Sequence, residues 1–189
     1  VNAVERAQTA HLPDPVDPAP IDQGIGVYFT ELLYGGVSFA IVEDRKFKSG
    51  PGEALKGKAA AKVSDPKELD VPGAELLGPR QEAFLKRWAN EPGPGMKVVL
   101  SQTIFCKATT HAGQELKRSI RDTDCGGWPQ SARDRALELI RPANAIMIHG
   151  DQHCGVLLRH GTRDWEDGPL AFMVPGTANG FPRAWWPEG

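Results

Sequence analysis

The sequence predicts an α/β fold. Runs of β-prone apolar residues alternate along the chain with segments whose apolar residues recur at helical spacing, a pattern typical of helices packed on a sheet. The chain has 189 residues, enough for one domain with a sizeable core. Glycine (21 residues) and proline (16 residues) are frequent, so we expect long loops, gathered at one edge of the sheet where ligands bind in such folds.

Charge and hydropathy exclude two classes of protein. The net charge is −2, with 22 basic and 24 acidic residues, so no basic surface for nucleic acid is expected. The longest apolar stretch, 37–42, is interrupted by Ser38 and falls far short of the ~20 residues that span a bilayer. The three cysteines show no Cys-x-x-Cys spacing, which argues against a structural zinc site and against a disulfide scaffold.

The first elements follow from proline and glycine positions. Residues 1–23 are predicted to form a Pro-rich extended arm, because the prolines of 11–20 remove backbone donors and favour extended geometry. The folded domain is expected over 24–189. Two β-prone runs, 26–30 and 36–42, are separated by Tyr34-Gly-Gly36, which predicts a hairpin or a tight strand-to-strand turn.

The middle of the chain carries one strong helix signal. Residues 45–78 are polar and broken by Gly and Pro, with one short helix expected near 52–63. A better helix begins at Pro79, a residue favoured at the first helical position. The residues of this helix that are expected to face the core are Phe84, Leu85 and Trp88. A strand over 97–105 is expected to follow.

The last third predicts a second helix and three strands. Ser131 and Asp134 have the spacing of a capping box, which would open a helix that ends before Pro142. The residues expected to face the core are Ala136, Leu137 and Ile140. Three short strands are predicted over 145–151, 155–160 and 170–174.

The most informative cluster comes at the end of the strand over 145–151. In an extended chain His149, Asp151 and His153 would share one face. Carboxylate oxygen suits Ca, Mg, Mn or Fe(III), and imidazole suits Zn, Fe or Mn, so this spacing can serve adjacent metal ions. The alternative is a turn aspartate beside a histidine that is satisfied by hydrogen bonds.

The segment Gly150-Asp-Gln-His153 resembles the last metal-binding motif of the PhoD-like alkaline phosphatase/phosphodiesterase family, within the calcineurin-like metallophosphoesterases. Four earlier segments resemble that family's motifs in the same order: 34–48, 77–88, 97–102 and 127–135. Together the resemblance covers about residues 24–182 and is collectively specific.

The resemblance implies the C-terminal half of a four-layer α-β-β-α sandwich that hydrolyses phosphate mono- or diesters. It places Asp151 and His153 on metal-ligand positions of the catalytic centre, with Fe and Ca expected and Mn or Zn as further candidates. Such ions polarise phosphoryl oxygens and lower the pKa of bound water. The resemblance also implies export to the periplasm or outside the cell.

The family's earlier metal-binding motifs are missing from this sequence, so we expect the C-terminal portion of a longer protein. The isolated chain is then expected to be inactive. It should require the N-terminal half or a partner chain to cover an apolar face. The alternative is a non-catalytic binding or interface module that keeps the fold.

Three further residues are candidates for substrate binding. Arg45 follows a predicted strand and could clamp phosphate oxygens; the alternative is an ion pair with Asp44 or Glu43. Gln102 ends a strand and could hydrogen-bond substrate or water, or be an ordinary strand-end amide. Asn179 lies in the loop after the last predicted strand, at the edge where site loops gather.

Histidine and aromatic residues near this edge have two interpretations each. His149 could hold a metal ligand in orientation, or it could be a packed strand histidine. Four aromatic residues and one arginine could form an aromatic wall beside the substrate, or they could pack in the core and at its rim. These residues are Trp128, Phe181, Arg183, Trp185 and Trp186.

Overall fold

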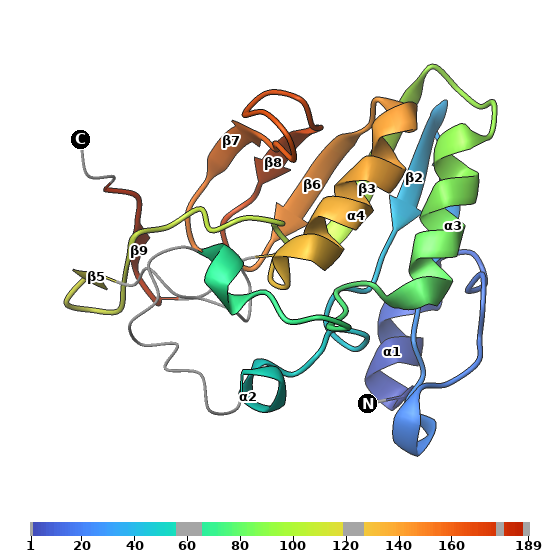
Figure 1. Cartoon of the computed structure of the whole chain (residues 1–189). Coiled ribbons are helices and arrows are strands. Elements are labelled where there is room, and N and C mark those ends of the chain that lie inside the picture. Colours follow the sequence, from blue (N-terminus) through green and yellow to red (C-terminus); the bar gives the residue numbers. More distant parts are fainter. Residues whose placement is uncertain (1, 56–65, 119–126, 177–179, 187–189) are drawn as a thin grey trace.

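The computed structural model describes residues 2–55, 66–118, 127–176 and 180–186 (Figure 1). The helices are α1 (Asn2–Thr9), α2 (Pro51–Ala54), α3 (Gly78–Asn90) and α4 (Gln130–Ile140), with 3-10 turns at Asp22–Gly24, Pro66–Leu69 and Arg141–Ala143. The strands are β1 (Thr30–Tyr34), β2 (Val37–Ile41), β3 (Met96–Thr103), β4 (His111–Ala112), β5 (Lys117–Arg118), β6 (Ile146–Gly150), β7 (Val156–Arg159), β8 (Leu170–Met173) and β9 (Arg183–Ala184).

Six strands form the main sheet, in the order β1-β2-β3-β6-β8-β7. The four central strands are parallel, and the two edge strands β1 and β7 are antiparallel to their neighbours. The predicted hairpin is confirmed: β1 and β2 are joined at Gly35 and Gly36, which both have positive φ. Its first strand spans 30–34 and not 26–30.

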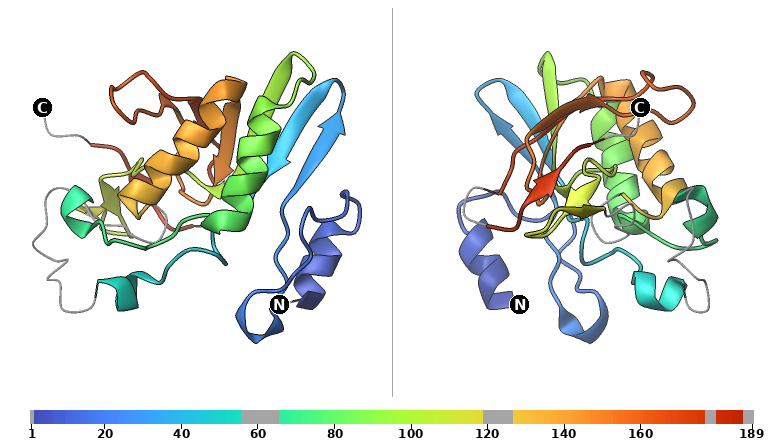
Figure 2. Two further views of the ribbon diagram at one scale, coloured as in Figure 1. Left: turned by 45° about the vertical axis from the view of Figure 1, so that its right-hand side comes forward. Right: turned by 90° about the vertical axis from the view of Figure 1, so that its left-hand side faces the viewer.

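Helices α3 and α4 cover one face of this sheet. They lie side by side in front of the strands in Figure 1, and the turned views of Figure 2 keep both helices on that side. The core faces predicted from the sequence are confirmed, because these six side chains are buried: Phe84, Leu85, Trp88, Ala136, Leu137 and Ile140. They share one cluster with Ala40, Val99 and Met147 of the central strands.

The opposite face of the sheet is also apolar. The register places Phe39 of β2 beside Val98 of β3. It places Phe172 of β8 between Ile148 of β6 and Leu157 of β7. Phe172 is 46% exposed and Leu157 is 66% exposed. A central sheet with two apolar faces is typical of a layered α/β fold, and the predicted α/β class is confirmed.

The N-terminal segment differs from the prediction. An extended arm over the whole of 1–23 is wrong for residues 2–9, which form α1. This helix is docked on the domain: the Asn2 side chain accepts a hydrogen bond from the Gly26 N–H, and Glu5 pairs with Lys46 at 2.8 Å. The prolines that favour an extended chain all lie after α1, so they do not affect the residues that form this helix.

The start of α4 also differs. Pro129 stands at the N-cap position and no side chain caps the helix. Ser131 donates instead to a carboxylate oxygen of Asp70 at 3.1 Å, so the predicted capping box is wrong. Of the helix expected near 52–63, α2 occupies Pro51–Ala54, and residues 56–63 lie outside the described residues.

A second, small sheet in the order β5-β4-β9 brings the C-terminal segment beside the loop that follows β3. No sequence signal predicted this pairing, because two-residue strands carry no periodicity. In the part of the chain that the structure describes, no helix is long and apolar enough to cross a membrane.

Candidate functional site

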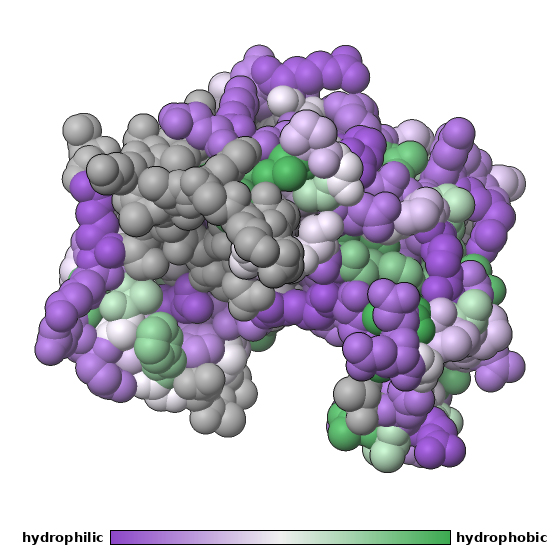
Figure 3. All heavy atoms as spheres, turned by 60° about the horizontal axis from the view of Figure 1, so that its bottom comes forward, coloured by the Kyte–Doolittle hydropathy of each residue, from purple (hydrophilic) through white to green (hydrophobic). Residues whose placement is uncertain are grey.

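The residues singled out from the sequence gather where the parallel strands end. Strands β2, β3 and β6 run in the same direction, so their carboxyl ends meet at one edge of the sheet, the lower edge in Figure 1. Arg45 follows β2, Gln102 lies near the end of β3, and Asp151 and His153 follow β6. Figure 3 turns this edge toward the viewer and shows mostly hydrophilic residues along the hollow between the two lower parts of the molecule.

The chain turns sharply after β6. The strand ends at Gly150, and Asp151 has a left-handed backbone with φ 72. The Gln152 N–H donates to the Gly150 carbonyl at 3.0 Å, which closes a three-residue turn. The alternation of an extended chain therefore stops at Gly150. The expectation that His149, Asp151 and His153 share one strand face is wrong.

This turn brings two of the predicted site residues together. A terminal guanidinium nitrogen of Arg45 lies 2.9 Å from Oδ1 of Asp151, and both side chains are about one-third exposed. The ion pair joins the end of β2 to the turn after β6. An exposed pair contributes little stability, so it matters more for where it places the two charges than for holding the fold together.

The residue before Arg45 is held rigidly. Asp44 is buried, and its Oδ2 accepts hydrogen bonds from the Ser101 hydroxyl and the Thr103 N–H, both at 2.9 Å, and from the Thr103 hydroxyl. Burial raises the pKa of Asp44, although these hydrogen bonds act in the opposite direction. Asp44 therefore ties the end of β2 to β3 and fixes the backbone from which Arg45 projects.

A buried amide fixes the other side of this segment. The Gln81 side chain of α3 donates to the Glu43 carbonyl at 2.6 Å and accepts from the Glu43 N–H at 2.7 Å. The Glu43 carboxylate in turn accepts from the Arg45 N–H at 2.9 Å and from the Gln102 side chain at 3.1 Å. Gln102 thus bonds within the sheet edge; its role in substrate binding stays a prediction.

The positioning role of Gln81 was not predicted from the sequence. The signal was present, because Gln81 lies three and four residues before Phe84 and Leu85 and so shares their buried helix face. A polar side chain on a buried face needs partners, and only the folded structure shows that these partners belong to Glu43.

His153 has a partner from the end of the chain. Its ring nitrogen Nδ1 lies 2.5 Å from the Phe181 carbonyl oxygen, and the two rings meet edge-on with centroids 6.1 Å apart. A carbonyl only accepts, so this geometry assigns the proton to Nδ1 and leaves the Nε2 lone pair available. A histidine in this form is the usual metal ligand.

His149 lies inside the fold. It is buried beside the rings of Phe105 and His160, at 5.7 and 5.9 Å between centroids. Burial lowers the pKa of His149 to about 4. No hydrogen bond to Asp151 or His153 is found among the described residues, and its predicted support of a metal ligand stays a prediction. Asn179 lies outside the described residues.

The aromatic residues divide between two places. Trp128 is buried and donates to the Leu69 carbonyl at 2.8 Å, which is core packing. Phe181 contacts His153, and Trp186 lies against His111 with ring centroids 4.7 Å apart. Phe181 is therefore the residue of this group that contacts the candidate site, and a wall beside the substrate stays a prediction.

Asp151 and His153 provide one carboxylate and one imidazole, which fit part of a metal centre. The Arg45 contact uses Oδ1 of Asp151, and the Phe181 contact uses Nδ1 of His153, so one ligand atom of each remains. Within the described ranges no group of three or more His, Cys, Asp or Glu side chains could hold a metal ion. The described residues therefore offer two candidate ligands at this turn, Asp151 and His153.

Comparison with known proteins gives the family of this chain and a solved structure with a similar fold. The model of the PhoD-like phosphatase family matches residues 4–169. A solved structure described as "Structure of PhoD" matches with a TM-score of 0.55 and 18% sequence identity, over 92% of this chain and 33% of that chain. No match was found among curated proteins. This chain thus spans about a third of the solved PhoD chain. It belongs to the PhoD-like phosphatase family.

Proposed function

We propose that this chain is the C-terminal part of a metal-dependent phosphoesterase that hydrolyses phosphate mono- or diesters. The observation that carries the proposal is the meeting of Arg45 with Asp151 at the carboxyl edge of the sheet, 2.9 Å apart. The pair supports the proposal because a guanidinium binds phosphate oxygens, a carboxylate binds metal ions, and the chain belongs to a phosphatase family.

Asp151 and the Nε2 atom of His153 would hold the metal, with Fe and Ca favoured by the family resemblance and Mn or Zn as further candidates. The bound metal supplies polarisation of a phosphoryl oxygen and a lowered pKa of bound water. Arg45 binds the phosphate oxygens through its planar guanidinium. Gln102 and Asn179 hydrogen-bond the substrate, and His149 supports the ligands from inside the fold.

The remaining ligands are proposed to come from the N-terminal half of the same fold, or from a partner chain. Two observations support this: the described residues hold no group of three or more His, Cys, Asp or Glu side chains fit for a metal, and the chain spans 33% of the solved PhoD chain. The same half would cover the apolar face that carries Leu157 and Phe172. On this basis little turnover is expected from the 189-residue chain alone, and export stays a prediction.

The test is a titration of the chain with Mn²⁺, followed by paramagnetic broadening of the amide resonances around residue 151, which detects the weak binding expected of two ligands. Asp151→Ala and His153→Ala are measured beside wild type. Asp164→Ala, an exposed aspartate of the β7–β8 loop, is the matched control. We expect metal in wild type and control, and its loss from both site variants. Hydrolysis of aryl and bis-aryl phosphates should follow the same order wherever turnover is seen.

Two results would overturn the proposal. Hydrolysis or metal binding that survives Asp151→Ala would remove Asp151 from the site. A wild-type chain that takes up no metal would favour the other candidate, a non-catalytic binding or interface module, which the presence of only one carboxylate and one imidazole at this turn also allows.

A further inference from the structure

A cavity of about 630 Å³ opens beside the turn that carries Asp151 and His153. Cys154 and Gly155, the residues directly after His153, form part of its wall. Gln152 ties this turn to the loop after β3 by donating to the Cys106 carbonyl at 3.2 Å. The volume lies within the range of ~300–1,000 Å³ that small-molecule sites occupy.

The floor of the cavity is apolar. Val156 and Leu158 of β7 line it together with Ala108 and Cys154. These side chains belong to one hydrophobic cluster, built around Ile104, Ala108 and Met173. Trp185 of the C-terminal segment closes one side. An organic group that enters this space would bury apolar surface on several sides, which favours binding.

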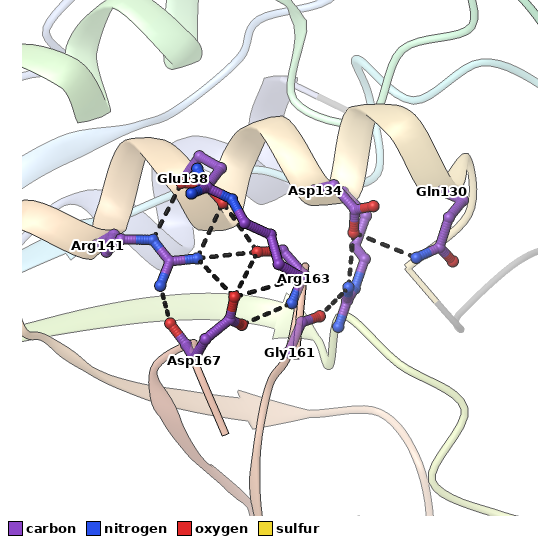
Figure 4. Close-up of polar contacts among 9 residues, drawn as sticks. Gln130, Asp134, Glu138, Arg141, Gly161, Arg163 and Asp167 are labelled. Carbon is purple, nitrogen blue, oxygen red and sulfur yellow. Dashed lines mark hydrogen bonds and ion pairs between the residues drawn. The ribbon is translucent and has the colours of Figure 1, made fainter. Parts of the chain in front are cut away.

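The charged side chains around the cavity are cationic. Lys107, Arg133 and Arg159 line it, and none of the described lining residues is acidic. Arg133 is fixed by its bonds to the Phe105 and Gly161 carbonyls and by Asp134. Figure 4 shows Asp134 on α4 and Gly161 on the loop beside this helix. Arg159 is exposed and has no ion-pair partner among the described residues. Asp134 balances the charge of Arg133, so Arg159 is the rim charge that opposes binding of a cation.

One buried polar side chain of the wall is unsatisfied. His160 is 1% exposed and lines the cavity, and neither of its ring nitrogens has a hydrogen-bond partner among the described residues. Burial lowers the pKa of His160 to about 3, so the ring is neutral and offers one donor and one acceptor. Buried groups of this kind are normally paired, and a polar atom of a ligand in the cavity would satisfy one of them.

We propose that this cavity receives the organic group of the phosphate ester bound at the Asp151–His153 turn, and that it selects a group that is apolar and uncharged or anionic against one that is cationic. This inference rests on the proposed function for the identity of the ligand as a phosphate ester. The fit itself depends on the apolar floor, the cationic rim and His160.

The test measures occupancy of the cavity without metal. Cys154 lines the cavity, so the rate at which iodoacetamide alkylates it, followed by peptide mass spectrometry, reports whether a ligand is present. The probes are octylphosphonate, methylphosphonate and octyltrimethylammonium at equal concentrations. At ten times the dissociation constant octylphosphonate should slow alkylation about tenfold. Methylphosphonate lacks the apolar chain and octyltrimethylammonium has the wrong charge, so both should leave the rate unchanged.

Two variants assign the effect to the cavity. Val156→Trp fills the floor and should abolish protection by octylphosphonate. Arg159→Gln removes a rim charge and should weaken protection about two- to fivefold, as expected for an exposed charge. Arg163→Gln changes an exposed cation of the loop after β7 that does not line the cavity, and it should leave protection unchanged. If Val156→Trp fails to fold by circular dichroism, the two arginine variants decide.

Equal protection by octyltrimethylammonium would overturn the charge selection. Absence of protection by octylphosphonate, or equal effects of Arg159→Gln and Arg163→Gln, would overturn the cavity as a binding site. Because the assay contains no metal, such a failure leaves the metal-binding test of Asp151 and His153 standing. Failure of that test would instead remove the phosphate ester and leave an apolar, anion-tolerant cavity.

Discussion

Arg45 and Asp151, which lie far apart in the sequence, form an ion pair of 2.9 Å at the carboxyl edge of the sheet. Parallel pairing of β2, β3 and β6 brings the ends of these strands together. Asp44 and Gln81 then fix the backbone directly before Arg45, through Thr103 and Glu43. The relationship therefore results from the sheet and its buried polar contacts more than from the attraction between two charges that are each about one-third exposed.

Removal of the Arg45 charge should tighten metal binding at Asp151. A cation next to a metal ligand repels the metal, so Arg45→Met is expected to lower the Mn²⁺ dissociation constant about two- to fivefold, the scale of an exposed ion pair. Paramagnetic broadening of amide resonances around Asp151 measures this constant. Arg163→Met is the control. A loss of Mn²⁺ binding in Arg45→Met would show that the ion pair is needed to position the carboxylate.

Gln81→Leu should destabilise the chain. It removes the partners of the Glu43 N–H and carbonyl while leaving both groups buried, at a cost of about 2–5 kcal/mol for the two groups. Urea unfolding measures the loss. Gln130→Leu, at the surface end of α4, should change the free energy of unfolding by less than about 0.5 kcal/mol. Equal effects of the two substitutions would contradict the role given to Gln81.

His160 should make the fold sensitive to acid. Burial lowers the pKa of His160 from 6.5 to about 3, so the unfolded chain takes up a proton first as the pH falls. Above pH 6.5 the neutral His160 ring makes its full contribution to the free energy of unfolding. This contribution is lost as the pH falls toward the pKa of His160 in the folded state.

When the pH is lowered from about 7.5 to about 5, the free energy of unfolding of His160→Leu should therefore fall by about 2 kcal/mol less than that of wild type. Urea unfolding at both pH values provides the measurement, with the exposed His11→Leu as control. A wild-type pH dependence that His160→Leu retains in full would contradict the assignment.

The apolar face opposite α3 and α4 should cause self-association of the isolated chain. Leu157 and Phe172 lie side by side there, 66% and 46% exposed. Exposed apolar patches of this kind favour association, because association removes them from water. Leu157→Lys with Phe172→Lys should shift the chain toward the monomer in sedimentation velocity. Leu33 is 65% exposed but lies on the face of the sheet that α3 and α4 cover, so Leu33→Lys should leave the association state unchanged. A wild-type chain that is monomeric would overturn the expectation.

Much of the architecture could be predicted because its signals are local. The hairpin at Gly35–Gly36 follows from turn chemistry, and the core faces of α3 and α4 follow from helical spacing. Two predictions, the extended N-terminal arm and the capping box, were wrong because other residues determine the structure there. The helix over 2–9 precedes the prolines on which the extended arm was based, and Ser131 found a partner in Asp70 that lies in another segment.

The candidate site divides in the same way. The sequence by itself determined which residues end the strands, and so identified Arg45, Gln102, Asp151 and His153 as the ones to consider. It also determined the family, through motifs that keep their order along the chain.

Only the tertiary structure decided the contacts of these residues. The left-handed turn at Asp151 redirects its carboxylate toward Arg45, and the pairing of β9 with β4 brings the Phe181 carbonyl to His153. The physical reason is that periodicity records which side of an element a residue occupies, whereas a partner from another segment is set by how strands pair and where loops return.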